Sequence, residues 1–351
     1  MQPVFDGHND LLLRLHQAPD RRDEIFLTGE GKGHLDLPRM QAGGFAGGLF
    51  AIWVPSPAQE GLDYLSQMET PPYDVPLPDL IGVDQAVGVA MHQAGLFHWM
   101  ARASGGAFRA CRSVAEIRAA VAAGSVAGIL HMEGAEAIGP DLDALHLLHA
   151  AGLRSLGPVW SRPTIFGHGV PFRFPGDPDT GPGLTADGLA LVRDCNALRV
   201  MVDLSHLNAA GFRDVMRLSD APLVATHSCA HAVCASTRNL TDWQLDAIAE
   251  TGGMVGLNFA ACFLRPDGRD GADVGFDVVM RHLDHLISRL GEDHVGFGSD
   301  FDGATMPEGI ADAAGLQHLI AACRAHGYGA ALVEKLAFGN WMRVLEKTWG
   351  G

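Results

Sequence analysis

The sequence lacks the features of proteins that bind nucleic acid or lipid bilayers. Its 351 residues include 41 acidic and 25 basic side chains, for a formal net charge of −16, and no run is rich in lysine or arginine. This charge balance repels phosphate backbones and anionic lipid surfaces. No segment approaches the ~18 apolar residues of a membrane span, and the first ten residues show no secretory leader. We therefore expect a cytoplasmic protein that binds neither nucleic acid nor membrane.

Cysteine is scarce and shows no pairing pattern. The six cysteines, at positions 111, 195, 229, 234, 262 and 323, include no Cys-x-x-Cys pair. Reduced, buried thiols in a reducing compartment are expected. A glycine-rich nucleotide fingerprint is also missing after the first predicted strand, which disfavours a dinucleotide-binding fold.

What is present is a long alternation of apolar strands and helical patterns. Hydrophobic residues make up 47% of the chain and charged residues 19%, which is typical of a globular protein. The eight predicted strands cover residues 3–5, 44–54, 126–133, 154–160, 200–206, 222–227, 253–258 and 294–300. Eight such units predict a parallel (β/α)8 TIM barrel, formed as one domain over residues 1–351. The Pro-, Gly- and Phe-rich segment 161–183 is too long for an ordinary turn, so we expect an active-site loop there.

Metal-binding or titratable side chains recur at the predicted strand ends. Active sites of such barrels lie at the carboxyl ends of the strands. The residues at these positions are His8, Asp10, Glu133, His206, His227 and Asp300. Three imidazoles and three carboxylates exceed what one tetrahedral zinc ion needs, so a two-metal site fits better. Glu133 is the residue that we expect to bridge the two ions.

Other candidates have simpler structural explanations. His282 and His285 are spaced i, i+3 within a helical pattern, which favours helix packing over metal binding. Cys229 is better explained as a buried inert thiol than as a zinc ligand. Asp203 could orient a neighbouring group or cap a strand end, and Asp302 is expected to form a turn or support a ligand.

Several short motifs resemble those of the membrane (renal) dipeptidase family of metallopeptidases, also called peptidase family M19. They occur in the family order and span most of the chain. The matching pieces are Asp6-Gly-His-Asn-Asp10, Met132-Glu-Gly134, Val202-Asp-Leu-Ser-His206, Thr226-His-Ser228, Ser236-Thr-Arg-Asn239 and Gly296-Phe-Gly-Ser-Asp-Phe-Asp-Gly303. The resemblance implies a dipeptidase with two Zn²⁺ ions that acts on dipeptides and forms a homodimer.

The resemblance also implies a role for each site residue. His8 and Asp10 would bind one zinc ion, His206 and His227 the other, and Glu133 would bridge both. Asp300 would handle protons, and Arg238 would contact the substrate. A guanidinium on a loop at the barrel mouth is a sensible clamp for a carboxylate.

One position departs from the family pattern. Trp160 occupies the end of the fourth strand, where the renal enzyme has a histidine that contacts substrate. An indole N–H can donate one hydrogen bond but carries no charge, so substrate binding at Trp160 would differ. Arg162, His168 or Arg173 of the 161–183 loop could supply a substitute.

The expected reaction is peptide-bond hydrolysis by a hydroxide that bridges the two zinc ions. Asp300 would accept the proton of the water and deliver it to the leaving amine. Two alternatives stay open at this point. One is another metal-dependent hydrolase barrel that acts on cyclic amides, lactones or exocyclic amines, although many of these carry His-x-His after the first strand, where this chain has His8-Asn9-Asp10. The other is a barrel that binds a peptide or metal without catalysis.

Overall fold

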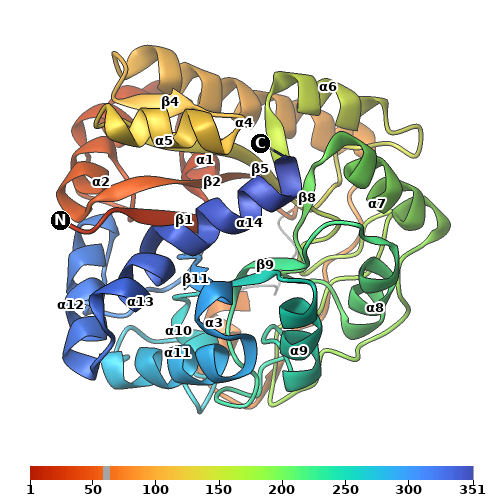
Figure 1. The fold of residues 1–351 in the computed structure, drawn as a ribbon. Helices are drawn as coiled ribbons and strands as arrows, with labels where there is room; N and C mark the ends of the chain where they lie inside the picture. Colours follow the sequence, from red (N-terminus) through yellow and green to blue (C-terminus); the bar gives the residue numbers. More distant parts are fainter. Residues whose placement is uncertain (58–63, 351) are drawn as a thin grey trace.

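Eight parallel strands form the centre of the molecule, and helices surround them (Figure 1). This computed structural model describes residues 1–57 and 64–350. The barrel strands are β1 (Val4–Asn9), β2 (Phe45–Trp53), β5 (Val126–Glu133), β6 (Leu153–Gly157), β8 (Met201–Val202), β9 (Val224–Ser228), β10 (Met254–Leu257) and β11 (Val295–Phe297).

The strand order closes into a ring. Neighbouring strands pair in the order β8-β6-β5-β2-β1-β11-β10-β9, all in parallel. A parallel bridge between Asp203, which follows β8, and Val224 of β9 joins the two ends. The amide of Leu204 donates to the carbonyl of Val224 at 2.9 Å across the same seam. The predicted (β/α)8 barrel is confirmed.

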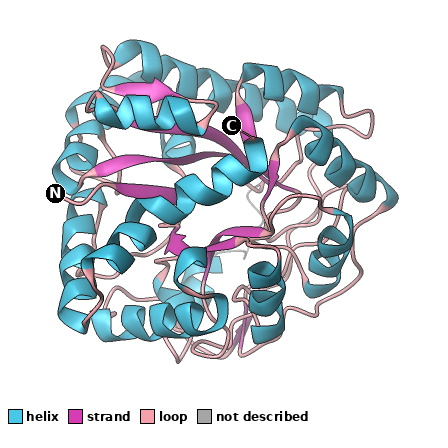
Figure 2. Cartoon of the chain, viewed as in Figure 1, coloured by secondary structure: helices cyan, strands magenta, loops and turns pink. Residues whose placement is uncertain are grey.

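Helices cover the outside of the strands, as Figure 2 shows. Those of the described residues are α1 (Leu11–Gln17), α2 (Leu37–Gly43), α3 (Tyr64–Met68), α4 (Val83–Ala103), α5 (Val114–Ala122), α6 (Asp143–Ala151), α7 (Ala186–Leu198), α8 (Ala209–Leu218), α9 (Asp242–Glu250), α10 (Ala261–Leu264), α11 (Phe276–Leu290), α12 (Leu316–His326), α13 (Ala330–Glu334) and α14 (Asn340–Trp349). Ser113, Thr185 and Asn208 cap α5, α7 and α8 by accepting a backbone N–H, as their residue types favour. Within residues 1–57 and 64–350, no helix combines the length and apolarity needed to cross a membrane.

One tryptophan fills the end of the barrel opposite the predicted site. Helix α14 crosses this end in Figure 1, and Trp341 of this helix is fully buried. The indole N–H donates to the carbonyl of Phe297 at 2.9 Å. A Cβ added at Gly7 would lie 2.4 Å from the Trp341 ring, and one at Gly296 would lie 2.9 Å from it. Glycine at these strand positions therefore makes room for the ring, because packed interiors leave little free volume.

The strand limits differ from the predicted ones. Strand β1 continues to Asn9, so His8 lies within the strand and only Asp10 follows it. Strand β8 has two residues, and the chain turns before His206, whose φ is +66°. Two short pairings were not predicted. They are β4 (Phe108–Ala110) beside β5, and β3 (Tyr73–Asp74) against β7 (Arg173–Phe174). The pattern of apolar residues along the sequence does not predict the geometry of turns or the pairing of short strands at the edge of a sheet.

Candidate metal centre

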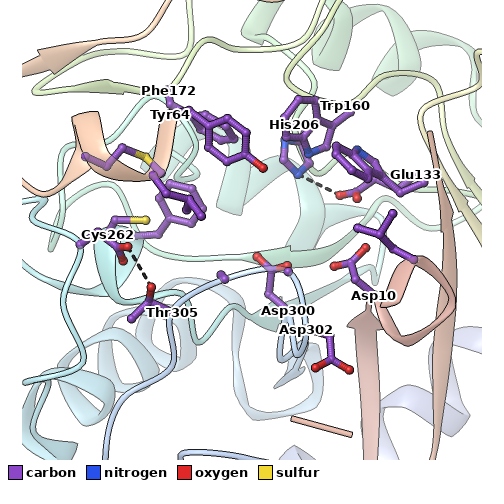
Figure 3. Close-up of a pocket in the computed structure, with 18 of the residues that line it drawn as sticks. Asp10, Tyr64, Glu133, Trp160, Phe172, His206, Cys262, Asp300, Asp302 and Thr305 are labelled. Atoms are coloured by element: carbon purple, nitrogen blue, oxygen red, sulfur yellow. Dashed lines mark hydrogen bonds and ion pairs between the residues drawn. The ribbon is translucent and has the colours of Figure 1, made fainter. Parts of the chain in front are cut away.

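Glu133, the last residue of β5, lies where three of the predicted histidines meet. Its Oε1 atom is 3.0 Å from Nε2 of His206 and 3.1 Å from Nε2 of His227. Its Oε2 atom is 3.6 Å from Nε2 of His8. The two oxygens of one carboxylate thus face different imidazoles, as Figure 3 shows in part. Such a carboxylate could contact two cations at once.

Asp10 and Asp300 complete the cluster on the side of His8. The Oδ2 atom of Asp10 is 3.4 Å from Nε2 of His8. One ligand atom from each of His8, Asp10 and Asp300 lies within 4.8 Å of the others, and the same holds for His8, Glu133 and His227. The structure therefore brings the five predicted ligands and Asp300 to one place.

Hydroxyl groups fix the direction of two imidazole rings. Ser161 Oγ lies 2.8 Å from Nδ1 of His206, and Thr226 Oγ1 lies 2.8 Å from Nδ1 of His227. With Nδ1 engaged, both Nε2 atoms face Glu133. A metal-binding histidine commonly uses its second nitrogen in this way, which sets the tautomer and the ring orientation.

Asp203 holds the backbone that presents His206 and His227. Its Oδ1 atom accepts hydrogen bonds from the amides of Ser205 at 3.0 Å and Thr226 at 2.8 Å. Its Oδ2 atom accepts from the hydroxyl of Thr226 at 2.5 Å. Asp203 thus stabilises the turn in which His206 adopts a positive φ, an arrangement that is costly without such support.

Burial dominates the electrostatics of the cluster. It raises the pKa of Asp10 to about 8 and, together with neighbouring carboxylates, raises the pKa of Glu133 well above its usual range. Burial also lowers the pKa of His8 to about 4 and the pKa values of His206 and His227 well below their usual range. The imidazoles are therefore neutral, and the charged forms of the carboxylates are disfavoured. A divalent cation would reverse this penalty on the carboxylates.

The residues fit divalent cations. Both ring nitrogens of His8 are buried and have no hydrogen-bond partner among the described residues. Leaving such groups unpaired is costly unless something binds them. Neutral imidazole nitrogens and carboxylate oxygens are ligands that zinc and similar ions accept.

The family described as membrane dipeptidase, peptidase family M19, matches residues 1–349. The chain belongs to this family. Membership confirms the predicted resemblance. It also confirms the predicted enzyme class, which is a hydrolase of the dipeptidase type. Membership in a metallopeptidase family implies that the protein binds a metal.

Two solved structures are similar over nearly the whole length. A metallopeptidase of family M19 described as dipeptidase AC is 64% identical, with a TM-score of 0.98, covering 100% of this chain and 99% of its own. A metallopeptidase from Rhodobacter sphaeroides, bound to a phosphinate mimic of the dipeptide L-Ala-D-Ala, is also 64% identical, with a TM-score of 0.98 and 99% of each chain covered. An uncharacterized protein from the pqqA 5′ region of Klebsiella pneumoniae is 45% identical over 263 residues, which are 75% of this chain and 97% of that protein.

In this dipeptidase-family chain, Asp300 lies at the edge of the metal-centre cluster with a strained backbone. Its φ is +62°, and Nδ2 of Asn258 donates to its Oδ2 at 2.8 Å. Burial raises the pKa of Asp300, and the nearby Asp10 raises it further, whereas His8 lowers it. A carboxylate that is held by a side-chain amide and has a raised pKa suits the transfer of protons.

Arg238 is buried beside the cluster. Its Nη1 donates to Oγ of Ser228 at 2.9 Å and its Nη2 to the carbonyl of His227 at 2.8 Å, while its buried Nε has no partner among the described residues. The guanidinium lies over the ring of Phe263, 5.7 Å from its centroid. Phe263 lines the cavity, whereas Arg238 is absent from the cavity lining.

Trp160 stands in the wall of the cavity above the cluster. Its ring packs edge-on against Trp53 and Phe172, with centroids 5.1 and 5.6 Å away, and lies 5.8 Å from the ring of His206. Because β6 ends at Gly157, Trp160 follows the strand rather than ending it, contrary to the prediction. Its place in the aromatic wall is shown in Figure 3.

The 161–183 loop contributes Phe172 to the cavity, but none of its predicted charged substitutes. Arg162, His168 and Arg173 are absent from the cavity lining. Arg162 is fully buried and forms an ion pair with Glu136 at 2.8 Å. Arg173 lies in β7, which pairs with β3. The hypothesis that one of these three replaces the family histidine is therefore not supported by their positions.

Two buried groups escaped the sequence-based prediction. His131 places its ring 5.4 Å from that of His8 and its Nδ1 2.8 Å from Oγ of Ser155. Asp6 accepts hydrogen bonds from the amide and hydroxyl of Ser299 at 2.6 and 2.9 Å. His131 and Asp6 lie two residues before Glu133 and His8. The two-residue repeat of a strand, which places them on the same face as those ligands, could have revealed them.

The simpler explanations given for other residues agree with the structure. His282 lies between the amide of Ala230 and the carbonyl of Leu264, and His285 contacts Asp242. Cys229 Sγ contacts the carbonyl of Asn258, and burial raises the pKa of its thiol well above the usual range. Asp302 accepts from Arg14 at 2.6 Å and from the amide of His34 at 2.5 Å.

Proposed function

We propose that this chain is a dipeptidase whose site holds two zinc ions. The observation that carries the proposal is the placement of the Glu133 carboxylate, with one oxygen near His206 and His227 and the other near His8. This separation suits a bridging ligand. His8 and Asp10 would hold one ion, and His206 and His227 the other.

The substrate class is supported by the similar metallopeptidase from Rhodobacter sphaeroides, which binds a mimic of a dipeptide. The cavity above the cluster has a volume of about 260 Å³. A space of this size suits a small ligand rather than a folded protein chain.

The metal ions and three side chains would have different roles in the reaction. When bound, two zinc ions would polarise the scissile carbonyl and acidify a water molecule. Asp300 would accept the proton of that water and pass it to the leaving amine. Arg238 would hold the free carboxylate of the dipeptide. Trp160 would pack against the substrate and help to exclude water from the cavity.

The remaining organisation is part of the same proposal. Residues 1–351 would form one catalytic barrel, with 161–183 as its active-site loop. A homodimer is proposed from the family resemblance alone. A cytoplasmic location is supported by six free and buried cysteines.

Replacing Glu133 by glutamine tests the proposal, because an amide keeps the shape but loses the negative charge. Bound zinc would be measured by elemental analysis, and turnover with a panel of L,L- and L,D-dipeptides. We expect the wild type to bind two zinc ions and Glu133→Gln to lose metal and activity together, whereas the exposed Glu308→Gln should change neither. Full metal content and full activity in Glu133→Gln would contradict the proposal. A parallel panel of cyclic amides and lactones would reveal the alternative hydrolase activity.

A further inference from the structure

The cavity extends away from the metal centre to a further carboxylate, Asp270. Figure 3 shows Thr305 and Cys262 across the cavity from Glu133 and His206. Both residues line the cavity, as does Asp270. The hydroxyl of Thr305 donates to Oδ2 of Asp270 at 2.9 Å, which is the contact drawn from Thr305 in the figure. Asp270 therefore belongs to this far end.

Asp270 is the cavity carboxylate that lies outside the metal centre and takes part in no ion pair among the described residues. Asp10, Glu133 and Asp300 belong to the metal centre, and Asp302 is paired with Arg14 at 2.6 Å. Within the described residues, Asp270 forms no ion pair within 4.0 Å, and the neighbouring Arg269 pairs instead with Asp273 at 2.8 Å. Neither lysine nor arginine is among the described residues that line the cavity. A partly buried carboxylate without a counter-ion is a ready site for a cationic group of a ligand.

The wall beside Asp270 is apolar. Met68, Cys262 and Phe263 are buried and line the cavity together with Asp270, whose amide donates to the carbonyl of Met68 at 2.9 Å. Long cationic side chains bury their methylene stems along such surfaces while the charged end reaches a polar group. An apolar wall that ends in a carboxylate thus matches the character of a lysine or arginine side chain.

The distance along the cavity is compatible with that side chain. A Cβ added at Gly303 would lie 2.2 Å from Oδ2 of Asp10 and 2.5 Å from Oδ1 of Asp300, so Gly303 borders the metal centre. Thr305 is two residues further, at most about 7 Å along the chain, and the Asp270 carboxylate lies one hydrogen bond of 2.9 Å beyond the Thr305 hydroxyl. A lysine ammonium lies five bonds of about 1.5 Å from its Cα, a reach of about 6 Å, and its hydrogen bond to a carboxylate adds about 3 Å.

We propose that Asp270 selects dipeptides that carry a lysine or arginine side chain. The inference rests on the proposed dipeptidase function. The free α-ammonium of a dipeptide cannot reach this end, because it lies two bonds from the scissile carbonyl carbon and stays with that carbon at the metal centre. The side chain is the cationic group that has the required length.

Steady-state kinetics of the zinc-loaded enzyme tests the inference. Lysyl-alanine and alanyl-lysine would be compared with their norleucine counterparts, which keep the length and lose the charge, and with alanyl-alanine. We expect kcat/KM to be about tenfold higher for the better lysine substrate than for its norleucine counterpart, mainly through KM, since hydrogen bonds to charged groups contribute this much. Asp270→Asn, whose amide oxygen can still accept from Thr305, should remove this preference and leave alanyl-alanine unchanged.

Two further variants sharpen the test. Asp267→Asn removes a nearby exposed carboxylate that pairs with Arg265 outside the cavity, so it should keep the lysine preference. Asp270→Lys should favour glutamyl-alanine or alanyl-glutamate over the lysine substrates.

The outcomes separate this inference from the proposed function. Hydrolysis of alanyl-alanine without any lysine preference in the wild type would overturn the inference alone. The inference also fails if Asp270→Asn keeps the preference, or loses alanyl-alanine turnover to the same extent as lysine turnover. A wild type that hydrolyses no dipeptide at all would overturn both proposals.

Discussion

The Nε2 atoms of His206 and His227 lie 3.2 Å apart, and both face Oε1 of Glu133. The two histidines come from different strand ends and have no repulsive charge, because burial keeps both imidazoles neutral. Two nitrogen lone pairs directed at one point create a position for a cation.

Removal of metal should destabilise the protein. Without cations, burial and the neighbouring carboxylates disfavour the charged form of Glu133, and a bound cation would remove this penalty. Ligand that binds the folded state in 1,000-fold excess over Kd adds about 4 kcal/mol. We expect dialysis against a chelator to lower Tm by at least about 5 °C, and zinc to restore it. In Glu133→Gln the same treatment should shift Tm much less. Equal Tm values for treated and untreated wild type would rule out a tightly bound metal.

Replacement of Asp300 by asparagine should separate proton transfer from metal binding. Asparagine keeps the shape of the side chain and an oxygen that can accept from Asn258, but it cannot take up a proton. We expect kcat to fall by about 100-fold to 10,000-fold, the range typical of a lost general acid or base, while zinc content stays the same. Elemental analysis beside kinetics checks this. If metal and activity disappeared together, Asp300 would be a ligand instead of a proton carrier.

The buried pair of Glu136 and Arg162 should contribute to stability. Both side chains are fully buried, and Arg162 also donates to the carbonyl of Val54 and to Oγ of Ser56 at 2.8 and 2.7 Å. Glu136→Gln leaves the guanidinium charge without a counter-ion, which typically costs about 3 kcal/mol or more. Urea unfolding should show a lower midpoint.

Glu24→Gln provides the matched control for the Glu136 variant. Glu24 also pairs with an arginine, Arg21, but on the exposed surface. Surface pairs of this kind contribute little, so the midpoint should not change measurably. Equal midpoints for Glu136→Gln and the wild type would show that the buried pair is not needed for stability.

The clustering of the predicted site residues could be expected from the sequence, whereas the groups that support them could not. His8, Glu133 and His227 stand at or near ends of apolar strands, and topology alone brings such ends together. His206 was found from the same pattern, although its strand has two residues and its own φ is positive. The turn at His206 depends on Asp203, which accepts hydrogen bonds from Ser205 and Thr226. A contact between such separate segments cannot be predicted from a local sequence pattern.

The environment of the charged loop residues could not be predicted for the same reason. Arg162 was considered as a substrate-binding group because it lies in the long Pro-, Gly- and Phe-rich segment 161–183, where we expected an active-site loop. Its buried partner Glu136 is 26 residues away in the chain, so the pairing depends on tertiary packing. The hydroxyl that orients His206 comes from Ser161, which is 45 residues away. The spacing of residues within a motif does not predict contacts between residues that are tens of positions apart in the sequence.

Removal of the Thr226 hydroxyl should weaken zinc binding although Thr226 is not a ligand. When Nε2 of His227 faces a cation, Nδ1 carries the proton and donates to Thr226 Oγ1, which in turn donates to Asp203. Thr226→Val keeps the shape and breaks both contacts. Loss of such a support typically costs 10-fold to 100-fold in metal affinity, which competition with a chromophoric chelator would measure. Thr348→Val removes a buried hydroxyl within α14, far from the site, and should leave affinity unchanged. If both variants bound zinc as the wild type does, the Thr226 contact would not orient His227 for metal binding.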